Sequence, residues 1–174
     1  SNTVSSNNSY HNGTDGIQLN SSSSFNTVTD NKLYSNGNDG IEMDNSSNNS
    51  LTGNNSYQNA SNGIYLDSSS NNIFIANNSY LNGWGIRLNA STGNTFIDGR
   101  LGYDAAGADL PNGIAEIRLN GGGGIETLTL KGTRVNPSVG IDLSGLDQEG
   151  AYLLSYDQDY ATGTLRIYGD YEVS

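Results

Sequence analysis

Cysteine is absent from this chain, and histidine, methionine and tryptophan each occur once. Without cysteine, the chain can form no disulfide and supply no thiolate ligand or nucleophile. The lone histidine, His11, cannot by itself build a metal cluster, and without a partnered nucleophile it cannot form a catalytic triad. Because no catalytic constellation is found, we expect a protein that is not an enzyme.

Basic residues are also scarce. Seven Lys and Arg stand against 18 Asp and Glu, which gives a formal net charge of −11. Binding to nucleic acid depends on Lys and Arg contacts with phosphates, so this balance argues against a nucleic-acid partner. No apolar run is long enough to span a bilayer, which argues against membrane insertion. A content of only 33% hydrophobic residues would suggest disorder unless those residues recur in register.

Asparagine and apolar residues do recur in register, at steps of 24, 23, 23 and 22 residues. The first column is asparagine followed two residues later by an apolar residue: Asn2, Asn26, Asn49, Asn72 and Asn94. A second column follows five residues later: Asn7, Asn31, Asn54 and Asn77. A third is Gly-Ile-x-Leu or Gly-Ile-x-Met, beginning at Gly16, Gly40, Gly63 and Gly85. Repetition at this period indicates stacked supersecondary units rather than one globule.

Each repeat predicts short strands with polar corners. Asn, Ser and Gly favour turns over helices, and apolar residues alternate as in Ile17 and Leu19. One repeat therefore fits one coil of a parallel β-solenoid, in which neighbouring strands lie about 4.8 Å apart. At that spacing the asparagine columns can form amide ladders that also satisfy the backbone of the corners. Because Asn tolerates left-handed backbone, we also expect it to form the sharp corners.

The repeat resembles a known family. Asn-x-hydrophobic-x-x-Asn, followed by Asn-Gly-x-x-Gly-Ile-x-Leu-x-x-Ser-Ser, is similar to the parallel β-helix repeat of NosD-like and carbohydrate-binding or sugar-hydrolase proteins. Residues 26–47 match best, and the resemblance covers roughly residues 1–100. It implies an all-β, right-handed parallel β-helix in an extracellular or cell-surface protein, and it says little about function.

The resemblance does not carry enzymatic or copper chemistry with it. The Asp-Pro-His-Glu run of alginate epimerases and the Asp-Asp and Gly-His-Gly signals of polygalacturonases are absent from the sequence. NosD is linked to copper delivery, but copper prefers Met, His or Cys ligands, which are scarce here. We therefore predict no cofactor apart from a candidate calcium site.

The register breaks after Phe96. We expect residues 99–112 to leave the coil as an excursion, with strands following at 115–119, 125–131, 151–156 and 164–168. Residues 1–100 would then form regular coils and residues 101–174 less regular coils of the same solenoid, with a separate small β-domain as the alternative. The chain enters its repeat in mid-coil at Ser1, which indicates either a fragment of a longer β-helix or a subunit whose open ends meet another copy.

The candidate calcium site contains three acidic residues near one turn, of which two share an outward strand face. They are Asp39, Glu42 and Asp44. The alternative is an ordinary solvated acidic surface.

Tyrosine forms a further column at steps of 24, 23 and 23 residues: Tyr10, Tyr34, Tyr57 and Tyr80. The residue before each occupies the inward aliphatic position of the family pattern, but only Leu33 is aliphatic and the other three are serine. The tyrosines therefore either face outward or rotate into the space that serine leaves. Facing outward, with Trp84 beside them, they would be a candidate surface for carbohydrate or for another protein. Plain structural stacking is the third alternative.

Three functions are compatible with these features. The first hypothesis is a non-catalytic extracellular β-helix that serves as a surface scaffold or fibre subunit and self-associates head to tail. The second is a carbohydrate-binding module that holds a polysaccharide on the tyrosine stripe. The third is a fragment of a polysaccharide lyase or epimerase whose catalytic coils lie outside this chain.

Overall fold

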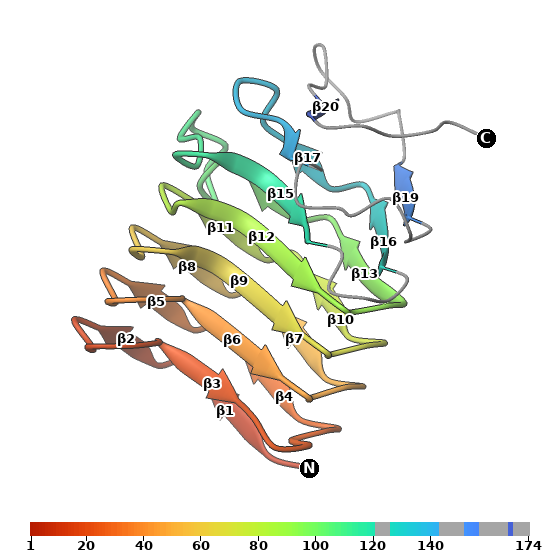
Figure 1. The fold of residues 1–174 in the computed structure, drawn as a ribbon. Coiled ribbons are helices and arrows are strands. Elements are labelled where there is room, and N and C mark those ends of the chain that lie inside the picture. Colours follow the sequence, from red (N-terminus) through yellow and green to blue (C-terminus); the bar gives the residue numbers. More distant parts are fainter. Residues whose placement is uncertain (121–125, 143–151, 157–166, 169–174) are drawn as a thin grey trace.

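The computed structural model describes residues 1–120, 126–142, 152–156 and 167–168. The coils stack from the N-terminal end, drawn red in Figure 1, towards the later coils in green and blue. Every pairing between the named strands is parallel and joins one coil to the next. The all-β solenoid is thus confirmed. In the part of the chain that the structure describes, no helix has the length and apolar character that crossing a membrane requires.

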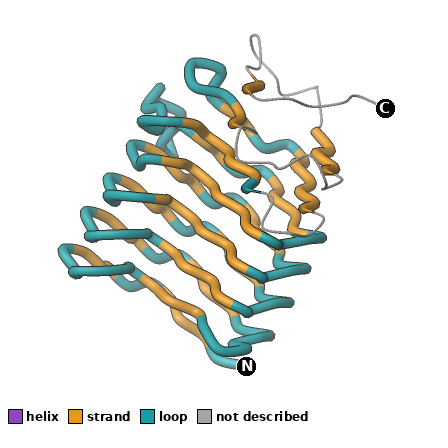
Figure 2. The backbone as a smooth tube through the Cα atoms, in the orientation of Figure 1, coloured by secondary structure: helices purple, strands orange, loops and turns teal. Residues whose placement is uncertain are grey.

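Three sheets run along the stack (Figure 2), and each of the first six coils contributes one strand to each sheet. The first sheet contains β1 (Thr3–Ser5), β4 (Thr27–Thr29), β7 (Ser50–Thr52), β10 (Ile73–Ile75), β13 (Asn94–Ile97), β16 (Glu126–Lys131) and β19 (Tyr152–Tyr156). The second contains β2 (Asn8–Tyr10), β5 (Lys32–Tyr34), β8 (Asn55–Tyr57), β11 (Asn78–Tyr80), β14 (Arg100–Leu101) and β17 (Arg134–Val135). The third contains β3 (Ile17–Leu19), β6 (Ile41–Asp44), β9 (Asn62–Asp67), β12 (Trp84–Asn89), β15 (Ala115–Leu119), β18 (Ile141–Asp142) and β20 (Ile167–Tyr168).

The core consists of the predicted apolar columns. Val28, Leu51, Phe74 and Phe96 follow one another in register on the first sheet and are buried. The rings of Phe74 and Phe96 stack with centroids 4.1 Å apart. On the third sheet the Gly-Ile-x-Leu columns stack in the same way. Because each coil adds a few apolar side chains to a continuous spine, a polar chain still builds a dry interior.

Asparagine ladders hold the bends between sheets. Asn54 uses all four hydrogen-bonding positions of its amide. Its Oδ1 accepts from the backbone N and the Nδ2 of Asn31, at 3.0 and 2.9 Å, and its Nδ2 donates to Val28 O at 2.8 Å and Asn77 Oδ1 at 2.9 Å. The column that begins at Asn2 repeats the bonds along the stack. A buried amide with no unmet bond stabilises the bend, since unpaired polar groups would be costly there.

A third ladder lies at the bend that follows the second sheet, and sequence analysis missed it. Successive amides are joined by Nδ2-to-Oδ1 bonds of 2.9–3.1 Å. Its members are Asn12, Asn36, Asn59, Asn82 and Asn112. All of them except Asn112 follow a tyrosine of the repeat by two residues, and this constant offset could have revealed the ladder.

The expectation that the ladder asparagines themselves adopt left-handed backbone is wrong. The residue immediately before a ladder Asn takes the positive φ instead, as in Asp30 (φ 55°) before Asn31 and Ala76 (φ 52°) before Asn77. This division of labour leaves the ladder side chain free to point into the bend, while its neighbour absorbs the strain of the corner.

The excursion begins later than the predicted residue 99, because residues 100–101 form β14 of the second sheet, and residues 102–114 separate β14 from β15. Within it, Tyr103 forms an isolated bridge with Asp109, and Asp104 Oδ1 accepts from the backbone N of Ala106 and Ala108, both at 2.9 Å. The later strands rejoin the third sheet at β15 and the first sheet at β16 and β19, close to the expected ranges. Of the strand expected at 164–168, residues 164–166 lie outside the described residues. The division of the chain at residue 100 stays a prediction.

Candidate functional site

The four tyrosines stand on the outer face of the second sheet. The residue before each points inward, and Leu33, Ser56 and Ser79 are buried. Tyr10 is the most open, with 50% of its surface exposed. Strand alternation therefore decides the orientation that the sequence left open.

The tyrosines do not rotate inward because the space left by serine is already occupied. Ser56 Oγ donates to the backbone oxygen of Gly63 at 2.7 Å, and Ser79 Oγ donates to that of Gly85 at 2.8 Å. A Cβ added to Gly63 would lie 1.8 Å from Ser79 Oγ. Serine on the second sheet and glycine on the third sheet therefore pack closely against each other, which leaves no interior space for the aromatic rings.

The tyrosine rings stack on one another along the axis of the solenoid. Successive centroids lie 5.0 Å apart, with interplanar angles of 3–7°. Because neighbouring rings cover one another's faces, the stack presents mainly ring edges and hydroxyl groups. Burial, and secondarily the adjacent phenol of Tyr34, raises the pKa of Tyr57. Burial, and secondarily Tyr57 and Asp104, raises the pKa of Tyr80 to about 12. These hydroxyls stay protonated at neutral pH and can donate hydrogen bonds.

A second outward column accompanies the stack, two residues earlier on each strand. Asn78 Nδ2 donates to Asn55 Oδ1 at 2.9 Å, and Lys32 is exposed one coil earlier. No carboxylate occurs in the described strands of this sheet. We call this surface the tyrosine face, formed by Tyr10, Tyr34, Tyr57, Tyr80, Asn8, Lys32 and Asn55. Asn78 is buried and is not part of it.

Trp84 is not brought into the tyrosine stack. It begins β12 on the third sheet, half-buried between two guanidinium groups. The Cζ atoms of Arg87 and Arg118 lie 5.5 and 5.3 Å from its ring centroid, and Arg87 Cζ also lies 5.2 Å from the ring centroid of Tyr65. We call Tyr65, Trp84, Arg87 and Arg118 the arginine cluster.

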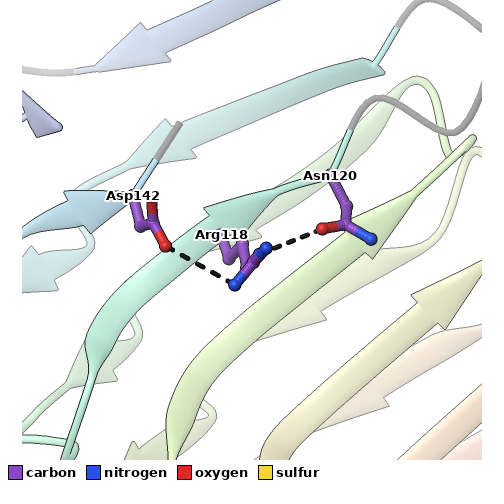
Figure 3. A network of polar contacts seen from close by, with 3 residues as sticks. All are labelled: Arg118, Asn120 and Asp142. Atoms are coloured by element: carbon purple, nitrogen blue, oxygen red, sulfur yellow. Dashed lines mark hydrogen bonds and ion pairs between the residues drawn. The ribbon is translucent and has the colours of Figure 1, made fainter. Parts of the chain in front are cut away.

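Figure 3 shows Arg118 between two polar partners on this face. Its Nη1 lies 3.6 Å from Asp142 Oδ2, and its Nε donates to Asn120 Oδ1 at 3.0 Å. Sequence analysis missed the arginine cluster. The available signal was that Arg87 and Arg118 both follow an isoleucine and precede a leucine, which places both on one outward column.

The structure does not bring the three candidate calcium ligands together. Asp39 is buried, and its Oδ1 accepts from the backbone N and the Nδ2 of Asn62, at 2.8 and 2.7 Å. Burial raises its pKa despite these bonds. Glu42 faces outward and accepts from Gln18 Nε2, whereas Asp44 accepts from Asn45 Nδ2. Across the described ranges, no group of three or more His, Cys, Asp or Glu residues could hold a metal ion.

A buried carboxyl ends the third ladder. Glu116 is fully buried and accepts from the backbone N of Asn112 at 3.1 Å and from its Nδ2. Burial raises the pKa of Glu116 to about 8, against the opposing effect of these two hydrogen bonds. It is therefore predominantly protonated at neutral pH, and we assign it a structural role.

A family model described as periplasmic copper-binding protein (NosD) matches residues 1–102. The described residues do not fit a copper centre. Met43 is wholly buried in the core, and His11 lies at a corner with its ring against Tyr10, 5.4 Å between centroids. These are the two soft donors of a chain without cysteine.

Solved structures share the fold. A double mutant of the periplasmic alginate epimerase AlgG aligns with a TM-score of 0.69 and 19% identity, over 88% of this chain and 38% of that one. Pectate lyase Pel9A aligns at 0.55 and 14%, over 96% and 46%. The A-module of mannuronan C-5 epimerase AlgE4 from Azotobacter vinelandii aligns at 0.56 and 16%, over 96% and 56%. No curated protein sequence matches.

These likenesses concern the fold, because identities are below 25%. The chain also spans less than two thirds of each of these structures. The family match, in contrast, covers more than half of the 174 residues. The chain belongs to the NosD family, and its fold is a right-handed parallel β-helix.

Proposed function

We propose that this chain is a glycan-binding β-helix of the cell envelope, and that a sugar chain lies along the tyrosine face. The observation that carries the proposal is the outward stack of four phenol groups beside a column of amide and cationic side chains. Hydroxyl and amide groups repeated about every 4.8 Å provide donors and acceptors at regular intervals along an extended ligand. The envelope location is supported by the periplasmic NosD family and by the periplasmic epimerase AlgG.

Binding rather than turnover is supported by the chemistry of this face. A general base needs a pKa near the working pH, whereas the pKa values of Tyr57 and Tyr80 are raised further above it. The described strands of the second sheet contain no carboxylate. Asp104, which acts on Tyr80 from the excursion, already accepts from the backbone N of Ala106 and Ala108 through its Oδ1. Because an alginate epimerase and a pectate lyase are among the structural relatives, polysaccharides are the first ligands to test.

The test measures glycan affinity by isothermal titration calorimetry, with oligomers of alginate, pectate and cellulose. Because the edges of the rings are presented, the double variant Tyr34→Phe/Tyr57→Phe keeps the stack and removes two hydroxyls. Two lost hydrogen bonds of about 1 kcal/mol each predict a roughly tenfold to thirtyfold weaker Kd. Thr29→Ala/Thr52→Ala, on the outer face of the first sheet, is the matched control and should bind like the parent.

The competing scaffold and enzyme hypotheses are separated by the same preparation. If light scattering showed concentration-dependent polymers and no oligomer bound saturably, the scaffold hypothesis would be favoured over glycan binding. Unsaturated or epimerised uronate products would replace it by the lyase or epimerase. Equal affinity of the phenylalanine variant and the parent would exclude the tyrosine face as the site.

A further inference from the structure

Two arginines occupy neighbouring strands on the outer face of the third sheet. Arg87 of β12 and Arg118 of β15 are register partners, so their side chains leave the sheet about 4.8 Å apart. Both point outward, since the residues on either side of each in the sequence are buried aliphatic residues. Two like charges at this distance repel unless an anion lies near them.

The arginine cluster carries more positive charge than the described carboxylates neutralise. Arg118 has an ion pair with Asp142 at 3.6 Å. Among the side chains that the structure describes, Arg87 has no carboxylate within ion-pair distance. In a chain of net charge −11, this is a local positive site, and such a site attracts an anionic ligand.

Stacked planar groups preorganise the arginine cluster. Trp84 lies beside both guanidinium groups, and Tyr65 lies beside that of Arg87. Arg87 Nε and Trp84 Nε1 are buried and have no hydrogen-bond partner among the described residues. A guanidinium held in this way loses little freedom when it binds a planar anion through two parallel hydrogen bonds.

Carboxylates on either side limit the size of the anion. One outward column runs along the stack in the order Glu42, Tyr65, Arg87, Arg118, Asp142. Asp67 lies on the same face as Tyr65, and Tyr65 Oη donates to its Oδ2 at 3.5 Å. A polyanion lying along this column would place charges beside Glu42 and Asp142, whereas a single carboxylate would meet the arginines alone.

We propose that the arginine cluster binds a single carboxylate group within an otherwise neutral sugar chain. The ligand class is therefore an oligosaccharide with sparse uronate residues rather than a polyuronate. The site lies on a different sheet from the tyrosine face and uses none of its residues. Each can be lost without the other.

The test compares three trisaccharides by NMR titration and calorimetry of the full chain. They are an aldotriouronic acid with one glucuronate on two xyloses, neutral xylotriose, and trigalacturonate with three carboxylates. We expect the aldotriouronic acid to bind at least tenfold more tightly than either of the others. Arg87→Gln should weaken it at least tenfold, and Arg87→Lys should restore only part of the loss, because lysine keeps the charge without the planar fork.

The matched control is Arg100→Gln, on the second sheet, which should bind the acid like the parent. Thermal unfolding of each variant separates lost binding from lost fold, and Arg118→Gln provides a second variant if Arg87→Gln does not fold.

Equal affinity for the acid and xylotriose, or unchanged binding by folded Arg87→Gln, would overturn the proposal. Displacement of the acid by an equal concentration of inorganic phosphate would also overturn it, because the site would then recognise negative charge without the sugar. Tyr34→Phe/Tyr57→Phe should leave this binding intact, so failure here is distinguishable from failure of the tyrosine face.

Discussion

The regular coils and the coil after the excursion close the same bend with different chemistry. In the regular coils, Asn59 accepts two hydrogen bonds from Asn36 and donates to Asn82 and to Leu33 O. After the excursion, the carboxyl of Glu116 takes the place of the amide and accepts from the backbone and side chain of Asn112. An interior rung of a ladder must both accept and donate, which requires an amide, whereas the last rung needs only to accept.

This contrast between an amide and a carboxyl explains why asparagine recurs at every interior rung of the ladder and why another residue can occupy the last rung. Glutamate is tolerated at the end of the third ladder, but burial in a dry interior disfavours its charged form and raises its pKa to about 8. An amide has no charge to bury and supplies two donors as well. Substitutions at interior and terminal rungs should therefore act through different mechanisms, with different dependence on pH.

The largest effect is expected at an interior rung. Asn54→Ala removes four buried hydrogen bonds, two from the backbone N and Nδ2 of Asn31 and two to Val28 O and Asn77 Oδ1. Asn31 Nδ2 keeps its bond to Val4 O, and Asn77 Oδ1 keeps its bond from the backbone N of residue 54. At about 1 kcal/mol for each hydrogen bond lost, we expect a loss of roughly 4 kcal/mol in the free energy of unfolding. Urea denaturation measures it, with exposed Asn8→Ala as control. A loss similar to that of the control would show that the ladder contributes little.

The terminal rung should show a pH-dependent effect instead. The pKa of Glu116 is about 8 in the folded protein and roughly 4.3 in an unfolded chain. Its contribution is complete below the unfolded pKa, where both states hold the proton. As pH rises towards 8, only the unfolded chain releases the proton, so stability falls by up to about 1.4 kcal/mol per pH unit and levels off above the folded pKa.

Glu116→Gln should remove this decline, because an amide does not titrate in that range. Urea denaturation of the variant and the parent at pH 5, 6, 7 and 8 compares the two slopes. Parallel slopes would mean that Glu116 is already ionised in the folded protein, and that the two hydrogen bonds from Asn112 outweigh its burial.

A smaller effect is expected where serine of the second sheet packs against glycine of the third sheet. Ser79→Ala removes one hydrogen bond to Gly85 O and one acceptor for Asn82 Nδ2. Because Asn82 keeps its bonds to Asn112 and Ser56 O, we expect a loss of about 1 kcal/mol in the free energy of unfolding. Ser5→Ala, on the exposed outer face of β1, is the control. If Ser79→Ala increased the free energy of unfolding, the hydrogen bonds of Ser79 would not stabilise the interior. Its role would then be to position the tyrosine face.

Sequence periodicity was sufficient for the fold. Constant steps place equivalent residues one strand spacing apart, so the apolar columns and the ladders beginning at Asn2 and Asn7 could be read from the printed chain. Periodicity was not sufficient for the corners. The residue with left-handed backbone is Ser6, Asp30, Gly53 or Ala76 in successive coils. Because its identity changes from coil to coil, the repeat pattern does not predict it.

What the sequence determined by itself is therefore the stack: its period, its parallel register and the amides that hold its bends. Only the tertiary structure decided which way the tyrosines face, because that depends on glycine backbone occupying the space inside Ser56 and Ser79. Only the tertiary structure joined Arg87 to Arg118 and Asn112 to Glu116. The excursion changes the step between coils, and once the step varies, distance along the chain no longer reports distance along the stack.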